Sequence, residues 1–406
     1  MSDILEFGRV ILVVAGGLSL AIAVRVAASR IGLPTAALLL TLAAVASDLS
    51  DRLATLLSFH DVQRVATLAL IAILFDGGMG IGLRRFRSAA VPITIVGVLG
   101  TFATAPLVAV AAHSILGFDW TVALLIGAAL APTDPAVTFS ILAGKEVEGR
   151  TGTILEGESG FNDPVGIALM IGMIELATVP DASVADVVWQ FLREMGIGLA
   201  VGAVAGLILL DALRRIPLPD RSLYPIAVLL AAGVIYGITT VAHGSGFLAV
   251  FVAGIVIGDA QYPRRIEVRH FHSALADLGE LAVFVALGLT INLGFIFAGA
   301  VWWQGLVLAV LLGFVIRPLV VWPLLMPSRL ERGERLFVMW AGLKGAVPIL
   351  LASLAVVSGT DQAAEIYGIV FVVVLFSVVV QGTLVPTAAR RLGVLMADAD
   401  TDAPSG

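Results

Sequence analysis

The sequence contains no cysteine and few charged residues. The missing cysteines exclude disulfide bonds, thiolate nucleophiles and thiolate metal sites together, and they leave the redox compartment undetermined. Asp, Glu, Lys and Arg make up 13% of the 406 residues, whereas 59% are hydrophobic. Soluble globular proteins carry roughly 25% charged residues. Lipid is therefore the solvent for most of this chain.

The hydrophobic residues fall into blocks long enough to cross a bilayer. About 30 Å of hydrocarbon takes roughly 20 helical residues, and such blocks recur along the whole chain. We predict an all-α polytopic membrane protein with about thirteen transmembrane helices. The predicted spans, numbered 1 to 13 in chain order, cover residues 8–28, 32–47, 62–80, 89–112, 119–142, 152–178, 184–213, 222–242, 246–259, 272–291, 299–326, 336–358 and 365–389.

Lys and Arg gather in every second connection between the spans. Short cytoplasmic connections are enriched in these residues, so we predict that the N-terminus is outside the cell and the C-terminus is cytoplasmic. Residues 1–395 are expected to form one membrane domain, and residues 396–406 a short disordered cytoplasmic tail. The cations after odd-numbered spans are Arg25, Arg30, Arg84, Arg85, Arg87, Lys145, Arg150, Arg214, Arg215, Arg221, Arg264, Arg265, Arg269, Arg329, Arg332, Arg335, Arg390 and Arg391, against Arg9, Arg52, Arg64 and Arg193 on the other side.

Two pairs of segments repeat at nearly the same offset. Residues 134–137 in span 5 align with 344–347 in span 12, and residues 105–108 in span 4 align with 317–320 in span 11, at offsets of 210 and 212. An odd number of spans separates the members of each pair, so the two copies face opposite ways across the membrane. This indicates two inverted repeats with broken helices at spans 5 and 12. The alternative is that Pro and Gly recur in membrane helices without a repeat.

Span 5 carries two prolines three residues apart near its middle, Pro132 and Pro135. Each removes a backbone donor and disfavours helical geometry in the residue before it, so we predict a break there. The Thr133 carbonyl or hydroxyl then becomes a ligand for a hard cation. We expect Asp134 to compensate the positive end of the second half-helix, and Lys344 to do the converse in span 12.

Span 6 brings oxygen-bearing side chains to mid-membrane. Glu158, Ser159, Asn162 and Asp163 lie at helical spacing on adjoining positions. Asp163 is about 12 residues, or roughly 18 Å, from the start of the span. Carboxylate, hydroxyl and amide oxygens suit a small hard monovalent or divalent cation. Because a proton and a cation compete for one carboxylate, Asp163 is the candidate carrier of both.

Other charged residues inside the spans need partners or water. Glu158 must not remain an unpaired buried anion, so Arg317 in span 11 is its first candidate partner and Lys344 its second. Such a pair has a structural role. Asp277 and Glu280, in the inner part of span 10, are expected to be solvated or structural.

At these residues the chain resembles the cation:proton antiporter-1 family, which contains bacterial NhaP-type transporters and animal sodium/proton exchangers. The resemblance runs from about residue 19 to residue 393 and is most specific at residues 133–135, 158–164 and 342–348. It implies a transporter, not an enzyme, that exchanges Na⁺ or Li⁺ for H⁺ across the cell (inner) membrane by alternating access, with a place in pH homeostasis.

The resemblance also implies roles for the site residues. Asp163 would be the ion and proton carrier, Ser159 and the Thr133 main chain would be Na⁺ or K⁺ ligands, and Asn162 and Asp134 would shape the site. The Asn-Asp pair is similar to that of electroneutral members and implies one cation for one proton. The resemblance further implies that Glu158 pairs with Arg317.

Family likeness extends to assembly. It implies a homodimer in which a core bundle, residues 89–178 and 299–389, slides against a scaffold, residues 8–80 and 222–291. The expected partners are the monovalent cation, the proton and the lipid bilayer, with no cofactor and no nucleic acid.

Two features complicate the pattern. The span-12 cation is usually Arg in the family and is Lys344 here, which keeps the charge but loses bidentate geometry. Residues 223–225 and 244–250 look more like members assigned to potassium/proton exchange, so K⁺/H⁺ exchange stays open as the alternative function.

Two other classes of function fit parts of the pattern. A cation channel or uniporter also suits a lone mid-membrane Asp, but channels more often show rings of carbonyls or repeated acidic residues. An intramembrane protease is suggested by residues 157–160, which resemble a nucleophile turn. The sequence offers no mid-membrane His and no HExxH pair to activate Ser159.

Overall fold

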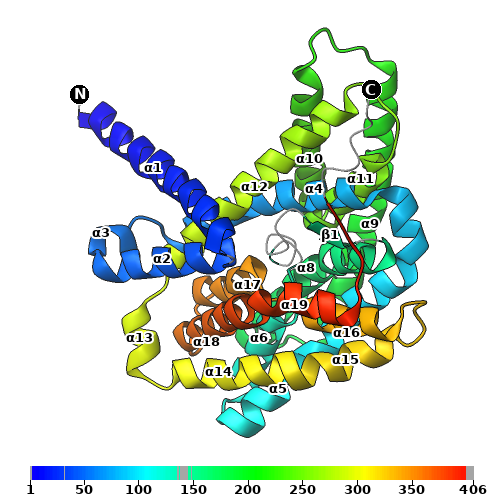
Figure 1. Ribbon diagram of the computed structural model, residues 1–406. Helices are drawn as coiled ribbons and strands as arrows, with labels where there is room; N and C mark the ends of the chain where they lie inside the picture. The colour runs from blue at the N-terminus through cyan, green and yellow to red at the C-terminus, as the bar shows by residue number, and fades with distance from the viewer. Residues whose placement is uncertain (1, 32, 135–136, 138–144, 148, 399–406) are drawn as a thin grey trace.

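The computed structural model is a bundle of helices crossing at varied angles, from which one long helix, α1, stands out (Figure 1). It describes all residues except 1, 32, 135–136, 138–144, 148 and 399–406. The elements of the first half are α1 (Ser2–Ile31), α2 (Thr35–Leu49), α3 (Asp51–Ala54), α4 (Phe59–Thr94), the π-helical η1 (Ile95–Gly100), α5 (Thr101–Leu116), α6 (Trp120–Leu130), β1 (Lys145–Val147), α8 (Gly149–Thr178) and α9 (Val184–Arg215).

The second half of the chain continues the helical pattern. Its elements are α10 (Leu223–Val241), α11 (Gly246–Gly258), α12 (Arg265–Leu289), α13 (Leu293–Ala298), α14 (Val301–Leu311), the π-helical η2 (Leu312–Ile316), α15 (Arg317–Leu325), α16 (Arg332–Ala341), α17 (Ala346–Val357), α18 (Ala363–Phe376), the π-helical η3 (Ser377–Gly382), α19 (Thr383–Leu392) and β2 (Met396–Asp398).

The predicted all-helical membrane fold is confirmed. Among the described residues, nine helical stretches are long and apolar enough to cross a membrane, and three shorter apolar helices accompany them. One of the nine, residues 59–116, contains both span 3 and span 4, so each of the thirteen predicted spans has a helical counterpart. The second half of span 5 falls mostly on residues outside the described ranges.

Spans 3 and 4 join through a kink where the sequence predicts a connection at residues 81–88. Gly82 has φ of 66°, a left-handed conformation that favours glycine, and it splits α4 without ending it. Directly after it, the Asp259 carboxylate accepts hydrogen bonds from the Leu83 and Arg84 amides at 3.2 and 2.8 Å. Asp259 thereby caps the start of the second half of α4, as an N-cap residue does.

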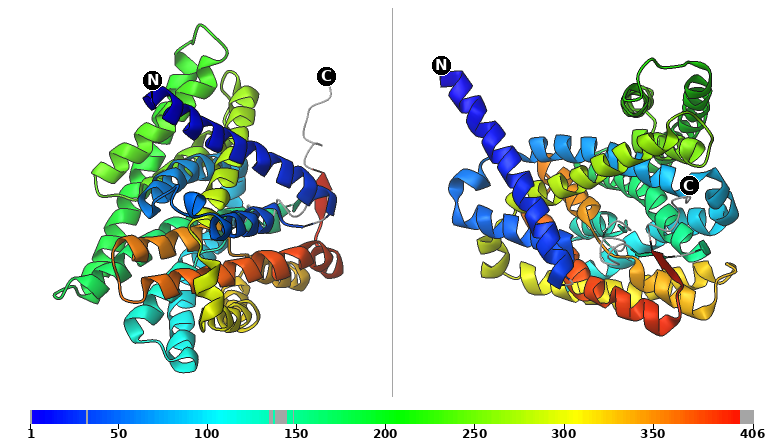
Figure 2. Two further views of the ribbon diagram at one scale, coloured as in Figure 1. Left: turned by 90° about the vertical axis from the view of Figure 1, so that its left-hand side faces the viewer. Right: turned by 45° about the horizontal axis from the view of Figure 1, so that its top comes forward.

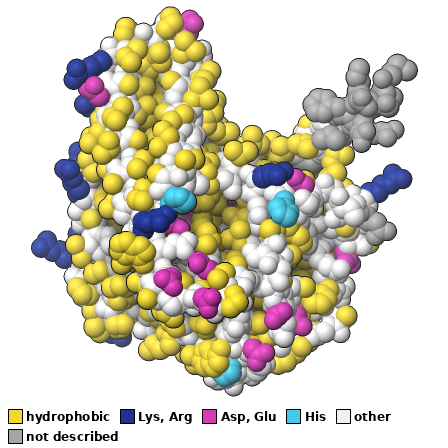
Figure 3. Space-filling model, turned by 180° about the vertical axis from the view of Figure 1, so that it is seen from behind, with side chains coloured by type: hydrophobic (Ala, Val, Ile, Leu, Met, Phe, Trp, Pro, Cys, Tyr) yellow, Lys and Arg dark blue, Asp and Glu magenta, His cyan; other side chains and the backbone are white. Residues whose placement is uncertain are grey.

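The helices differ greatly in how much of them the protein buries. Of an 18-residue apolar stretch of α1, 11% is buried inside the protein, whereas 72% of the corresponding stretch between residues 332 and 357 is buried. The right-hand view of Figure 2 shows α1 reaching away from the bundle. Hydrophobic side chains also cover most of the face seen in Figure 3. The periphery therefore offers an apolar surface to lipid, and α17 lies at the centre.

The structure also contains a short two-stranded sheet. β1 pairs antiparallel with β2, with Val147 opposite Met396. The prediction of a disordered tail from residue 396 is therefore wrong for residues 396–398, which extend the ordered part of the chain by pairing with the segment before α8. The remaining tail, residues 399–406, lies outside the described residues.

Candidate functional site

Two interrupted spans meet at the centre of the bundle. In span 5, α6 ends at Leu130 and residues 131–134 are not helical. In span 12, α16 ends at Ala341 and α17 begins at Ala346, with non-helical residues 342–345 between them. The Asp134 amide donates a hydrogen bond to the Leu343 carbonyl at 2.8 Å. The breaks predicted in spans 5 and 12 are therefore present, and the two broken segments cross in direct contact.

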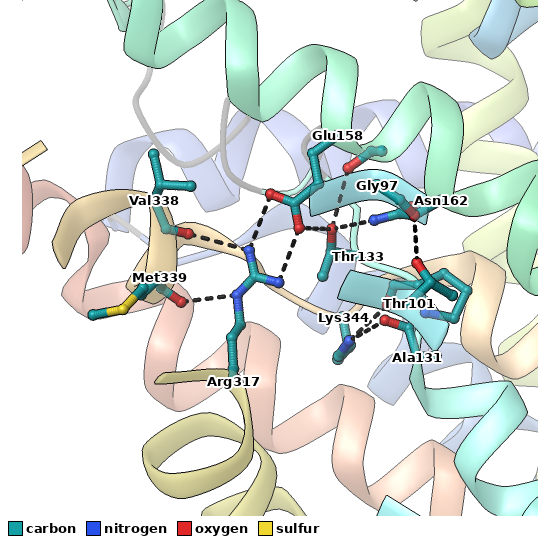
Figure 4. A network of polar contacts seen from close by, with 12 residues as sticks. Gly97, Thr101, Ala131, Thr133, Glu158, Asn162, Arg317, Val338, Met339 and Lys344 are labelled. Atoms are coloured by element: carbon teal, nitrogen blue, oxygen red, sulfur yellow. Dashed lines mark hydrogen bonds and ion pairs between the residues drawn. The ribbon is translucent and has the colours of Figure 1, made fainter. Parts of the chain in front are cut away.

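Lys344 lies against the end of α6. Its ammonium donates hydrogen bonds to the carbonyl oxygens of Ala131 at 3.0 Å and Pro132 at 2.7 Å (Figure 4). The last carbonyls of a helix have no intrahelical partner and carry partial negative charge. Lys344 is 2% exposed, so its charge compensates this helix end in a buried setting.

Asp134 makes the reciprocal contact. Its Oδ2 accepts a hydrogen bond from the Ala346 amide at 3.3 Å, at the positive N-terminus of α17. Lys344 was expected to compensate a helix end in its own span, yet it lies on the end of α6. The second half-helix of span 5, which Asp134 was expected to compensate, lies mostly outside the described residues, so that expectation stays a prediction. The physical reason is the crossing, which brings the Lys344 ammonium to the end of α6 and the Asp134 carboxylate to the start of α17.

Two glycines allow this crossing. A Cβ atom at Gly342 would overlap the Arg317 guanidinium, and a Cβ atom at Gly345 would overlap the Asp134 carboxylate. Glycine on both sides of Lys344 thus has a steric explanation, because any larger side chain displaces the buried Arg317 or the half-buried Asp134.

Glu158 and Arg317 form an ion pair in the interior. The guanidinium donates to both carboxylate oxygens, at 2.9 and 3.2 Å, and the two side chains are 3% and 7% exposed. Arg317 also donates to the carbonyls of Met339 at 2.9 Å and Val338 at 3.1 Å (Figure 4). These carbonyls belong to the last turn of α16, so Arg317 caps that helix while it neutralises Glu158.

The Thr133 hydroxyl joins the broken span to α8. It accepts a hydrogen bond from the Asn162 amide nitrogen at 2.7 Å and lies 3.3 Å from both a Glu158 carboxylate oxygen and the Ser159 hydroxyl (Figure 4). All four residues are buried. Because Glu158 is held by Arg317, the ion pair and the hydroxyl and amide groups form one continuous polar network.

Asp163 follows Asn162 on α8 and lies near the middle of the helix, about 21 Å from its start at Gly149. It is 6% exposed, and its Oδ1 has no hydrogen-bond partner among the described residues. The same holds for the Oδ1 of Asn162. Asp163 lines a small cavity together with Asp134. The site thus offers unused oxygen acceptors beside an otherwise satisfied network.

The structure brings most of the predicted site residues together. Thr133, Ser159, Asn162 and Glu158 share the polar network, whereas Asp163 and Asp134 face the cavity.

One carboxylate that lines the cavity has no transport role in the predictions from sequence. Glu280 of α12 lines the cavity with Asp163 and Asp134, although it was expected to be solvated or structural. An acidic residue inside an apolar span is a functional candidate by default, and that signal was present. The periodicity of α12 did not reveal which of its faces borders the cavity.

Comparison with known proteins supports the same reading of the fold. The family model described as "Sodium/hydrogen exchanger, transmembrane" matches residues 16–391. A solved structure of the sodium proton antiporter MjNhaP1 from Methanocaldococcus jannaschii superposes with a TM-score of 0.77 at 21% identity, covering 94% of this chain and 100% of that one. At that identity the likeness shows the fold alone.

Several curated relatives are similar over most of this chain. A K⁺/H⁺ antiporter, NhaP, from Alkalimonas amylolytica is 34% identical over 366 residues, or 90% of this chain. The K⁺/H⁺ antiporter NhaP2 of Shewanella sp. strain ANA-3 is 32% identical over 89% of this chain. The Na⁺/H⁺ antiporter ApNhaP of Aphanothece halophytica is 29% identical over 82% of this chain and 65% of its own length.

The match covers only part of the longer relatives. The chain spans 63% of the length of the Alkalimonas and Shewanella proteins, which is less than two thirds. The family model nevertheless matches nearly the whole of the membrane-spanning region, and the fold agrees with it. This chain is a member of the sodium/hydrogen exchanger family.

Proposed function

We propose that the chain exchanges a monovalent cation for a proton across the cell membrane, with Asp163 as the carrier that binds each in turn. The observation that carries this proposal is the buried Asp163 carboxylate, whose Oδ1 has no hydrogen-bond partner among the described residues. An ionised carboxylate buried without a partner costs several kcal/mol. A proton or a cation removes that cost, and because only one of them binds at a time, their movements are coupled.

Oxygen ligands for the cation lie around this carboxylate. Ser159 is four residues before Asp163 and therefore on the same side of α8. The Thr133 carbonyl belongs to the non-helical segment beside it, and the Oδ1 of Asn162 has no hydrogen-bond partner among the described residues. Such ligands suit an alkali cation. We assign Asp163, Ser159 and Thr133 as ligands, with Asn162 and Asp134 shaping the site.

The charge balance supports an electroneutral cycle. Glu158 is neutralised by Arg317, and Asn162, the residue before the carrier, is uncharged. The exchangeable site on α8 therefore has one carboxylate, which carries either one cation or one proton. A stoichiometry of one cation for one proton follows, and a membrane potential does not drive the exchange.

The cation that we propose is Na⁺, with K⁺ as the alternative. The relatives themselves divide, since the Alkalimonas and Shewanella proteins carry the name K⁺/H⁺ antiporter and the Aphanothece protein the name Na⁺/H⁺ antiporter. Ligand types are shared between the two ions. Selectivity then depends on the size of the cavity that the same oxygens enclose.

Family membership supports the proposed setting of the exchange. The chain would lie in the cell membrane with its N-terminus outside and its C-terminus in the cytoplasm, because the basic connections follow the odd-numbered spans. We further propose that it works as a homodimer, whose core (residues 89–178 and 299–389) moves against a scaffold (residues 8–80 and 222–291).

Purified protein in liposomes with a trapped pH dye tests the proposal. With the membrane potential held at zero, a gradient of NaCl or KCl should move protons in the wild type, and Asp163→Asn should abolish the flux. Asp211→Asn is the matched control, because Asp211 is exposed and pairs with Arg215 on α9. Sodium- and potassium-driven proton flux at the wild-type rate in Asp163→Asn would overturn the proposal.

The same preparation separates exchange from a channel or uniporter. A channel passes cations along the potential without moving protons in return, and its flux stops when the potential balances the gradient. An electroneutral exchanger keeps moving protons at zero potential. Running NaCl, KCl and LiCl in turn then ranks the transported ions.

A further inference from the structure

A second acidic side chain borders the cavity that Asp163 lines. Glu280 of α12 joins Asp163 and Asp134 there, and the rest of the lining is apolar, including Leu70 and Ile73 of α4. Asp163 supplies a buried oxygen that has no hydrogen-bond partner among the described residues. The cavity thus has a deep carboxylate that requires a ligand and a further carboxylate on another helix.

Glu280 also belongs to a second, smaller space. That space is lined by both Glu280 and Arg25 of α1. Arg25 forms an ion pair with Asp277 at 3.1 Å, and the two side chains are 41% and 53% exposed. Asp277 precedes Glu280 by three residues, which puts both on one face of α12. Glu280 therefore stands between the protein surface and the cavity of Asp163.

The surroundings of Glu280 do not explain it as a structural residue. No hydrogen bond or ion pair joins its carboxylate to another residue in the described part of the chain, in contrast to Glu158, which Arg317 holds with two hydrogen bonds. An acidic residue that only stabilises a membrane protein is usually paired. A carboxylate that is half-buried and bordered by two cavities can instead exchange ligands.

The three carboxylates that line the cavity do not form a metal site. Within the described ranges, no three Asp, Glu, His or Cys residues are grouped so that they could hold a metal ion together. Asp134 is engaged with the Ala346 amide at the start of α17. Glu280 and Asp163 are therefore two separate carboxylates on the same cavity, and Glu280 is the one nearer the protein surface.

We propose that Glu280 is the mouth carboxylate of the cation path, which attracts the transported cation from the side of Arg25 and Asp277 and passes it to Asp163. This inference rests on the proposed exchange function. A negative charge in a narrow, low-dielectric mouth raises the local concentration of cations and thereby the rate of their capture. The maximal rate, set by Asp163 and the conformational change, depends on Glu280 much less.

The chain with Glu280→Gln, reconstituted in liposomes, tests this inference. At low ionic strength we expect the KM for NaCl or KCl to rise about tenfold, within the range for electrostatic focusing, with the maximal rate within about twofold of the wild type. Glu280→Asp should keep a KM close to the wild-type value because it keeps the charge. Glu267→Gln is the control, since Glu267 lies on α12 but is exposed and pairs with Arg264.

Ionic strength distinguishes an electrostatic role from a packing role. Raising choline chloride screens the charge of the mouth, so the difference in KM between wild type and Glu280→Gln should shrink. An unchanged KM in Glu280→Gln, or Glu280→Asp as defective as Glu280→Gln at every ionic strength, overturns the mouth role. Exchange in the wild type and its loss in Asp163→Asn are measured first, so failure of the proposed function is distinguishable from failure of this inference.

Discussion

The Lys344 ammonium lies 2.7 Å from the carbonyl oxygen of Pro132, so a cation on span 12 caps the interrupted end of span 5. In turn, Asp134 of span 5 accepts a hydrogen bond from the Ala346 amide at the start of α17 in span 12. The two breaks are therefore stabilised as a pair, and charge removed from one span should weaken the other.

Replacing Lys344 tests this mutual stabilisation. Lys344→Met should cost about 2–3 kcal/mol, because two buried carbonyl oxygens lose a charged donor. Lys344→Arg should lose less, since the charge remains. Thermal unfolding in detergent measures both, with the exposed Arg221→Gln as the control. Equal melting temperatures for Lys344→Met and wild type would contradict the capping role.

The Glu158–Arg317 pair should show partial rescue in a double variant. Arg317→Ala leaves a buried carboxylate without its partner and should destabilise the protein by about 3–5 kcal/mol. Adding Glu158→Gln removes that charge, but the Val338 and Met339 carbonyls still lack their donor. Protein yield and thermal stability should therefore recover only in part, and no recovery at all would show that the helix-capping contacts dominate.

The Asp163 carboxylate should lower the thermal stability of the protein while it enables exchange. Asp163→Asn removes an acidic group whose Oδ1 has no hydrogen-bond partner among the described residues, so the melting temperature in salt-free buffer should be equal to or higher than that of the wild type. Added NaCl or KCl should stabilise the wild type by mass action and leave Asp163→Asn unaffected. Equal stabilisation of the two proteins by salt would argue against cation binding at Asp163.

Glycine at the crossing should be irreplaceable. Gly345→Ala places a methyl group onto the Asp134 carboxylate, so we expect lower stability and loss of most exchange. Gly233→Ala on α10 is the matched control, because a Cβ atom there meets nothing within 4 Å. Melting temperature and proton flux check both variants. If Gly345→Ala had the melting temperature and proton flux of the wild type, the crossing would be able to accommodate a methyl group, and the prediction would be wrong.

The sequence predicts the spans and the break in span 5 because both depend on local properties. Hydrophobic length gives the helices, and Pro132 interrupts span 5 wherever the chain packs. Charge balance also points to Arg317 as the partner of Glu158, and an ion pair joins them in the structure. These features need no knowledge of which segments touch.

Other features depend on contacts between distant segments. Lys344 caps a helix end in span 5 and Asp134 caps one in span 12, and this requires the crossing of two segments about 210 residues apart. The place of Glu280 on the cavity requires the rotation of α12 against its neighbours. The kink at Gly82 depends on Asp259 of a later connection, which caps the helix that continues through it. Local pattern carries none of this information.

The distance along the chain between the two caps has a consequence for how the protein is made. Pro132 leaves the ribosome 212 residues before Lys344, and at about 5–20 residues per second that interval lasts about 10 to 40 s. During this time the interrupted end of α6 is in or near the membrane without the ammonium that caps it in the finished protein. Water, the insertion machinery or a provisional neighbour has to satisfy those carbonyls until span 12 arrives.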